Sequence, residues 1–163
     1  MKSKLIILIV GACLMQMACQ SHHTPALGKI VDNYLVNVDD QGVILHGYDP
    51  VSFREGKSMP GNQSIQTKYH GAIYYFANEE NKRLFIERPA AYEPEFGGYC
   101  AYGVSVKHLS PIEVWTFDST FQNRNIFNHN EKAVAGWNKD IPGNYEAAIA
   151  QWEVFKKQYL SNN

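Results

Sequence analysis

The sequence predicts an α+β fold: a single small domain in which a β-hairpin and short strands pack against several helices. The first observation is an alternating segment, residues 65–69, followed by the turn pair His70-Gly71 and a second apolar segment. The second is a long amphipathic helix at the C-terminal end, whose apolar side chains recur at helical spacing: Tyr145, Ala148, Ile149, Trp152, Phe155 and Tyr159. The third is the absence of internal repeats, which favours one domain.

The first expected elements lie between residues 43 and 56. Residues 43–46 are a candidate strand, and the following Gly-Tyr-Asp-Pro segment is a helix start. Asp49 is interpreted there as a helix cap rather than a general base, and Pro50 suits the first helical position because its missing N–H costs nothing. Gly56 is expected to end this brief helix.

The middle of the chain predicts a hairpin and a helix. Residues 65–69 and 73–76 form the two strands, and His70 is interpreted as a turn residue. Asn78 should cap a helix with an apolar stripe, which Pro89 stops. A loop with Gly97 and Gly98 then leads to Tyr99-Cys100-Ala101, where a pair of glycines permits positive φ angles.

The last third predicts two short strands and two helices. The strands lie around residues 114–117 and 125–127, and Asn130 or Asn128 should cap a helix that runs through Trp137. The final amphipathic helix is expected to follow Asn144. We interpret its apolar stripe as core packing.

Length and composition exclude several classes of protein. The chain has 163 residues, of which 45% are hydrophobic and 13% aromatic, enough for a buried core and too many for a disordered protein. Fifteen Lys and Arg against 16 Asp and Glu give a formal net charge of −1. A nucleic-acid partner is therefore not expected, because phosphate binding needs clustered positive charge.

The N-terminus has the pattern of an export signal. A short basic start precedes an apolar run that is shorter than a membrane span, which is typical of a signal peptide over residues 1–18. Cys13 and Cys19 both lie where a bacterial lipoprotein leader places its lipidated cysteine, and the distance from the N-terminus favours Cys19. We expect an exported protein, periplasmic or in the cell envelope, held on a membrane by lipid at Cys19, with residues 19–42 as a polar tether leading into a domain at 43–160.

If Cys19 carries lipid, Cys100 is left as the single thiol of the mature chain. It then lacks a partner for an internal disulfide in an oxidising compartment. It is either a buried small hydrophobe, a metal ligand or a redox-active thiol. A helix starting at this position would lower the pKa of the thiol.

An ordered set of short motifs resembles the YHS domain family. The motifs are Asp49-Pro50-Val51, Tyr69-His70-Gly71, Tyr74-Tyr75-Phe76, the segment 81–87 with Phe85, and Pro89 followed by Tyr92. Together with Gly97-Gly98-Tyr99-Cys100-Ala101, they resemble the extended form found in exported bacterial YHS proteins, over residues 47–152. The resemblance implies an association with heavy metals bound through cysteines.

The chain departs from this family at the cysteine positions. Where short YHS domains carry cysteines, this sequence has Ser52, Ala77 and Asn81. A hydroxyl, a methyl and an amide cannot form the soft thiolate site that copper(I) or zinc prefers.

The remaining candidate ligands are Cys100, His108 and His46. His108 follows Cys100 by eight positions in a loop, so that the two could form a Cys/His pair suited to copper or zinc. His46 could reach the same place only through the tertiary fold. No motif of a known catalytic constellation is present, so an enzyme is not expected.

Three hypotheses follow from the sequence. The leading one is an exported YHS-like binding protein that holds copper, zinc or a small ligand near Cys100. The alternatives are a protein-interaction module with an aromatic contact surface, and a thiol redox protein that acts through Cys100.

Overall fold

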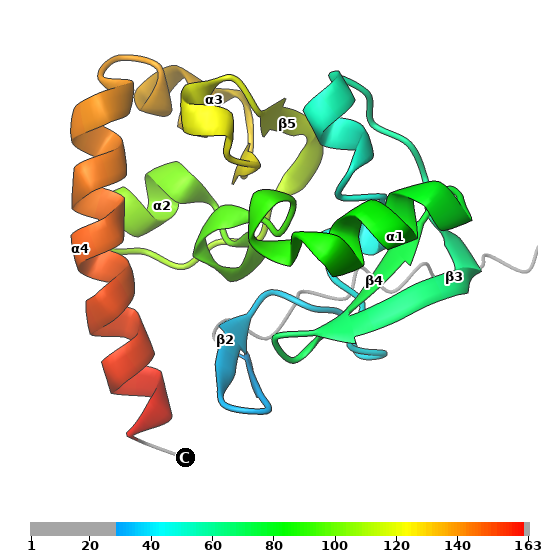
Figure 1. Ribbon diagram of the computed structural model, residues 1–163. Coiled ribbons are helices and arrows are strands. Elements are labelled where there is room, and N and C mark those ends of the chain that lie inside the picture. Colours follow the sequence, from blue (N-terminus) through cyan, green and yellow to red (C-terminus); the bar gives the residue numbers. More distant parts are fainter. Residues whose placement is uncertain (1–28, 162–163) are drawn as a thin grey trace, which may run out of the picture.

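The computed structural model describes residues 29–161 and confirms the α+β class (Figure 1). The expected signal peptide 1–18, the lipidation site Cys19 and the tether up to residue 28 lie outside the described residues. The elements follow in the order β1 (Lys29–Val31), β2 (Tyr34–Val36), β3 (Asn62–Tyr69), β4 (Ala72–Phe76), α1 (Glu79–Glu87), α2 (Ala101–Ser105), β5 (Glu113–Asp118), β6 (Ile126–Asn128), α3 (Glu131–Trp137) and α4 (Ile141–Leu160). Five short 3₁₀ turns, η1–η5, connect them: Leu45–Gly47, Ser52–Glu55, Pro89–Ala91, Glu95–Gly98 and Phe121–Asn123.

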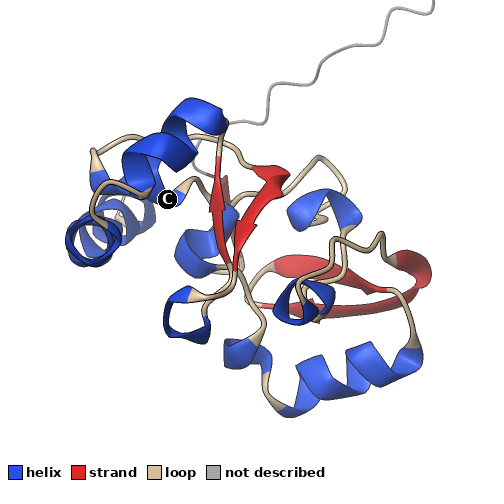
Figure 2. Ribbon diagram, turned by 90° about the horizontal axis from the view of Figure 1, so that it is seen from above, coloured by secondary structure: helices blue, strands red, loops and turns tan. Residues whose placement is uncertain are grey.

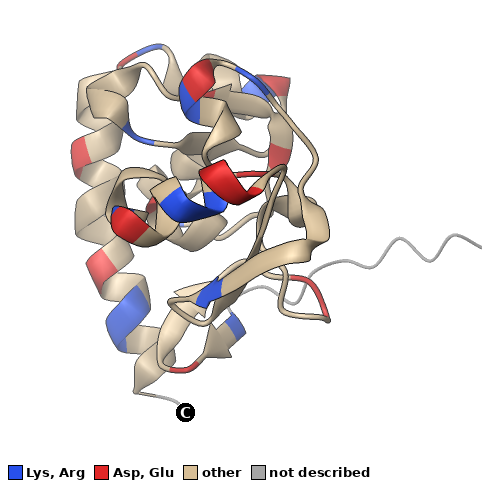
Figure 3. Ribbon diagram, turned by 45° about the vertical axis from the view of Figure 1, so that its right-hand side comes forward, with Lys and Arg blue, Asp and Glu red and all other residues tan. Residues whose placement is uncertain are grey.

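Within residues 29–161, the strands form three antiparallel pairs, β1–β2, β3–β4 and β5–β6. Seen from above, α4 lies at one side of the molecule and the β3–β4 hairpin at the other (Figure 2). Acidic and basic residues are interspersed along the helices (Figure 3), as in α1, where Arg83 pairs with Glu80 and Glu87. No helix in this part of the chain is both long and apolar enough to span a membrane.

Two clusters of buried side chains form the core. The first lies between the β3–β4 hairpin, α1 and η2, and it is rich in aromatic rings: Phe53, Tyr74, Phe76, Phe85 and Phe127. The second lies where α4 packs on α2 and β2, and includes Phe96, Tyr99, Val104, Trp137 and Ala148. Burial of this apolar area is the main force that joins the helical side to the hairpins.

Two of the predicted helix caps, Asn78 and Asn130, are confirmed. Asn78 accepts the N–H of Asn81 at 2.8 Å, and Asn130 accepts that of Ala133 at 3.0 Å, as expected of caps. The last helix begins earlier than predicted, at Ile141. Asp140 caps it by accepting the N–H of Gly143, and a proline in the first turn fits the helix start.

The folded part begins earlier than the predicted tether allows. Residues 29–36 form the β1–β2 hairpin, and Leu35, Val36 and Val38 are buried in the core. The expected tether is therefore wrong for residues 29–42. Composition suggests a tether there because a short hairpin with a polar turn resembles a linker. Residues 43–46 are not a regular strand either, since Val43 makes only an isolated bridge to Ile73 before η1 begins at Leu45.

The predicted hairpin turn is confirmed at His70-Gly71. Both residues have positive φ, 45° and 75°, and they connect the register pair Tyr69 and Ala72 as a two-residue hairpin loop does. Gly71 is required by space as well, because a Cβ there would collide with the carbonyl oxygen of Val31. The turn therefore packs directly on the β1–β2 hairpin and holds His70 beside it.

Candidate functional site

Cys100 caps the start of helix α2, which the sequence offered only as one possibility, and its thiol makes hydrogen bonds inside the protein. Its Sγ accepts the N–H of Gly103 at 3.3 Å, which caps the helix, and its S–H donates to Oδ1 of Asn128 at 3.6 Å. The residue is 1% exposed. Cys100 thus joins α2 to β6 as a buried structural residue.

The expected lowering of the thiol pKa does not occur. Burial raises the pKa of the Cys100 thiol, and this effect outweighs the backbone N–H groups of Gly103, His129 and Tyr102, which act in the opposite direction. A helix of five residues supplies few aligned dipoles, whereas the surrounding core removes nearly all water. At neutral pH the side chain is therefore a neutral thiol.

The structure does not gather the three predicted ligands into one group. His108 is exposed at the turn after α2, where its backbone N–H donates to the carbonyl of Gly103 at 2.8 Å. His46 lies with its Nε2 3.1 Å from the carbonyl oxygen of Ile112 and borders a cavity of about 350 Å³. Among residues 29–161, no three His, Cys, Asp or Glu side chains are arranged to hold a metal ion. Metal binding through Cys100 stays a prediction of the sequence.

Ser52, Ala77 and Asn81, the positions where the resemblance to YHS domains would place cysteines, converge on Asp49. This fully buried carboxylate accepts the N–H of Val51, the N–H of Ala77 and the side-chain amide of Asn81, at 2.8, 2.8 and 2.6 Å. The hydroxyl of Ser52 donates to the carbonyl of Asp49 at 2.7 Å. Asp49 therefore joins the η2 turn, the end of β4 and helix α1. The expected helix start at Asp49 and Pro50 is wrong, because η2 begins only at Ser52 and Val51 occupies its N-cap position without a side-chain hydrogen bond.

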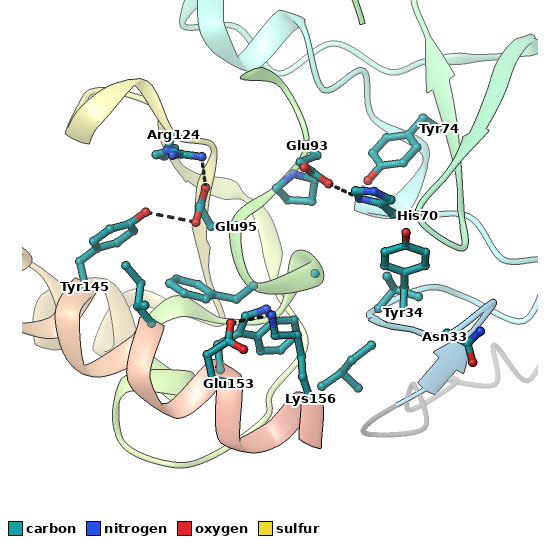
Figure 4. A pocket seen from close by; sticks show the side chains of 17 residues that line it. Asn33, Tyr34, His70, Tyr74, Glu93, Glu95, Arg124, Tyr145, Glu153 and Lys156 are labelled. Atoms are coloured by element: carbon teal, nitrogen blue, oxygen red, sulfur yellow. Dashed lines mark hydrogen bonds and ion pairs between the residues drawn. The ribbon is translucent and has the colours of Figure 1, made fainter. Parts of the chain in front are cut away.

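A pocket lined by aromatic and charged side chains lies elsewhere, between α4, the η4 loop and the tips of two hairpins. Its volume is about 480 Å³. Figure 4 shows its side chains, and we call it the His70–Glu95 pocket. The lining combines aromatic rings with charged groups: Tyr34, His70, Tyr74, Glu93, Glu95, Phe96, Arg124, Tyr145, Trp152, Glu153 and Lys156, among others.

One wall of the pocket is built around His70. Its Nδ1 lies 3.0 Å from Oε2 of Glu93, and its ring stacks on Tyr34 with centroids 4.3 Å apart. Tyr74, from β4, completes this wall, as Figure 4 shows. Burial raises the pKa of the Tyr74 hydroxyl, and the charge of Glu93 raises it further.

The opposite wall is built around Glu95. Arg124 Nη1 lies 3.0 Å from one carboxylate oxygen of Glu95, and the hydroxyl of Tyr145 donates to the other at 3.3 Å (Figure 4). Burial raises the pKa of Glu95 above its ordinary value, whereas Arg124 and Tyr145 act to lower it. A buried carboxyl with a shifted pKa beside a cavity is a common feature of functional sites.

The loop that carries both glutamates is held by buried contacts. The side-chain amide of Asn125, 1% exposed, donates to the carbonyl of Tyr92 at 2.7 Å, and the N–H of Glu95 donates to the carbonyl of Asn125 at 2.9 Å. At Gly97, φ is 59° and a Cβ would collide with the carbonyl oxygen of Leu35. Gly98 also has a positive φ, 80°, so both glycines use the conformational freedom that the sequence predicted for the pair.

Sequence reasoning missed this pocket. His70 was interpreted as a turn residue, which it is, but its imidazole also lines the cavity. Glu93 and Glu95 flank Pro94, and two carboxylates on either side of a proline were the only local signal. Their partners His70 and Arg124 lie 23 and 29 residues away in the chain, so that only the tertiary fold brings the groups together.

Comparisons of the chain with protein-family models, with curated proteins and with solved structures found no match. The resemblance to the YHS family therefore rests on the motifs quoted above.

Proposed function

We propose that this chain is an exported small-molecule-binding protein that holds its ligand in the His70–Glu95 pocket. The observation that carries the proposal is the cavity of about 480 Å³, which combines aromatic walls with a few fixed polar groups. Ligand sites of proteins have this size and this mixture, because apolar surface supplies affinity and a few polar groups fix the orientation.

The geometry favours this site over a ligand at Cys100. The thiol is 1% exposed and engaged by Gly103 and Asn128, so that a ligand would have to break two internal hydrogen bonds to reach it. The aromatic rings of the pocket, by contrast, already face a cavity. The N-terminal leader pattern supports the assignment of the protein to the cell envelope.

A screen with small aromatic compounds tests the proposal. The panel contains neutral, anionic and cationic indole derivatives, and binding is followed by thermal denaturation and by tryptophan fluorescence, since Trp152 lines the pocket. A compound at about ten times its Kd should raise Tm by about 3–6 °C in a chain of this length.

Two variants on α4 make the screen specific. Ile149, 45% exposed, lines the pocket, and Val154, 53% exposed, does not. We expect Ile149→Trp to fill the cavity and weaken binding, while Val154→Trp leaves it unchanged. The proposal fails if no member of the panel binds at millimolar concentration, or if binding is the same in both variants.

A further inference from the structure

The charged groups of the His70–Glu95 pocket do not cancel. Three glutamates line it, Glu93, Glu95 and Glu153, against two permanent cations. Arg124 pairs with Glu95 at 3.0 Å, and Lys156 pairs with Glu153 at 2.6 Å. Each cation therefore has its own carboxylate, and the third carboxylate is left over.

Glu93 is this remaining carboxylate. Within residues 29–161, its ion-pair partner is the imidazole of His70 at 3.0 Å, and neither Lys nor Arg lies within ion-pair distance. The Glu93 side chain is 28% exposed, so water screens it only in part. Whenever the imidazole is neutral, the pocket carries one net negative charge at this position.

The field of Glu93 reaches groups on three neighbouring segments. Burial raises the pKa values of Tyr69, Tyr74 and Glu95, and the negative charge of Glu93 contributes to each of these increases. These residues come from β3, β4 and the η4 loop, which surround the carboxylate. The shared direction is what a nearby negative charge produces on acids.

The walls next to Glu93 are also suited to a cation. The ring of Tyr34 lies 4.3 Å from that of His70, and Tyr74, Phe96 and Trp152 line the same cavity. The faces of aromatic rings carry a negative quadrupole, so that they attract organic cations. An anionic ligand would meet the opposite situation, because both permanent cations are already paired and Glu93 repels it.

We propose that the His70–Glu95 pocket selects a small aromatic monocation, whose charged nitrogen lies against Glu93 and whose ring lies among the aromatic walls. This inference rests on the proposed function and adds the chemical class of the ligand. It predicts a preference by charge among molecules that share one ring system.

Three indole compounds of nearly equal size test the preference: tryptamine, a monocation at neutral pH, the neutral tryptophol and the anionic indole-3-acetate. Their Kd values are measured by calorimetry on the whole protein. We expect tryptamine to bind at least about tenfold more tightly than either of the others. Glu93→Gln, which keeps the size of the side chain, should remove most of this difference.

Two further variants separate a charge effect from loss of structure. Glu146→Gln removes the same charge from an exposed position of α4 that does not line the pocket, and should change the tryptamine Kd by less than about threefold. His70→Asn keeps a residue that suits the hairpin turn and leaves Glu93 in place, so the preference for tryptamine should persist. Thermal denaturation confirms that each variant is folded.

The outcomes distinguish this inference from the proposed function. If tryptophol or indole-3-acetate binds as tightly as tryptamine, the charge inference is overturned, while ligand binding in the pocket stands. If Glu93→Gln keeps the full preference, Glu93 is not the recognising group and the inference also fails. If tryptamine does not bind up to about 10 mM, the inference fails, and the wider panel with Ile149→Trp decides the proposed function separately.

Discussion

Replacing Asp49 by asparagine should destabilise the protein strongly, although the two side chains have nearly the same shape. The carboxylate accepts N–H groups on both oxygens: Val51 donates to Oδ1, and Ala77 and Asn81 donate to Oδ2. An asparagine can direct its oxygen to only one of these sides. Its amino group then faces at least one N–H donor in a fully buried position.

The magnitude follows from the hydrogen bonds that are lost or weakened. One buried donor without a partner costs about 1–3 kcal/mol, and the bonds that remain lose the contribution of a charged acceptor, about 1 kcal/mol each. Removal of a buried charge offsets part of this loss. We therefore expect Asp49→Asn to lower the free energy of unfolding by about 3 kcal/mol, a large part of the 5–15 kcal/mol typical of a domain.

Urea denaturation followed by circular dichroism measures this change. With an m-value of about 2 kcal/mol/M, the midpoint should fall by about 1.5 M. Asp118→Asn is the matched control, because Oδ1 of Asp118 accepts two bonds from Thr120 at an exposed site, which an asparagine oxygen can also accept. Equal midpoints for the two variants would refute the reasoning.

Three further predictions concern the core, the thiol and a pocket carboxyl. Phe85→Ala should cost about 3–5 kcal/mol in urea denaturation, because the ring is 1% exposed and packs on Tyr74 and Phe76; a loss under about 1 kcal/mol would contradict the packing. Cys100 should react with iodoacetamide at least about 100-fold more slowly in the native than in the unfolded protein, because its thiol is buried and its pKa is raised. Peptide mapping measures the two rates, and comparable rates would indicate an accessible thiolate. The same protein and its Cys100→Ser variant can be compared for copper and zinc content, and equal contents would refute the metal hypothesis drawn from the sequence. Because burial raises the pKa of Glu95, the folded state holds its proton more tightly and loses stability as pH rises through the window above the ordinary value of 4.5. The free energy of unfolding of Glu95→Gln relative to the parent should therefore increase through that window. A difference that stays constant with pH would exclude the shift.

Local patterns predicted the elements whose signals lie within a few residues of one another. Asn78 and Asn130 cap their helices as expected, and His70-Gly71 forms the turn of the hairpin, because caps and two-residue turns depend on neighbouring backbone groups. Cys100 begins α2 after a pair of glycines with positive φ, but the local pattern offered a helix there only as one possibility.

Long-range contacts explain where these local patterns were insufficient. The β1–β2 hairpin looks like a tether in composition, and it becomes core only because Leu35 packs in the cluster beneath α4 and Val36 packs in the cluster at the β3–β4 hairpin. The pKa of Cys100 could not be predicted from its helix position alone, because burial depends on residues that surround it from the whole fold.

The sequence by itself determined the α+β class, the helix caps at Asn78 and Asn130 and the hairpin turn at His70-Gly71, since these caps and this turn depend on interactions over a few positions. The tertiary structure alone decided that Cys100 is enclosed and that His70, Glu93, Glu95 and Arg124 share one cavity. The physical reason is that solvation and charge balance depend on every group within several ångströms. Those groups come together only when α4 and the hairpins pack around the η4 loop.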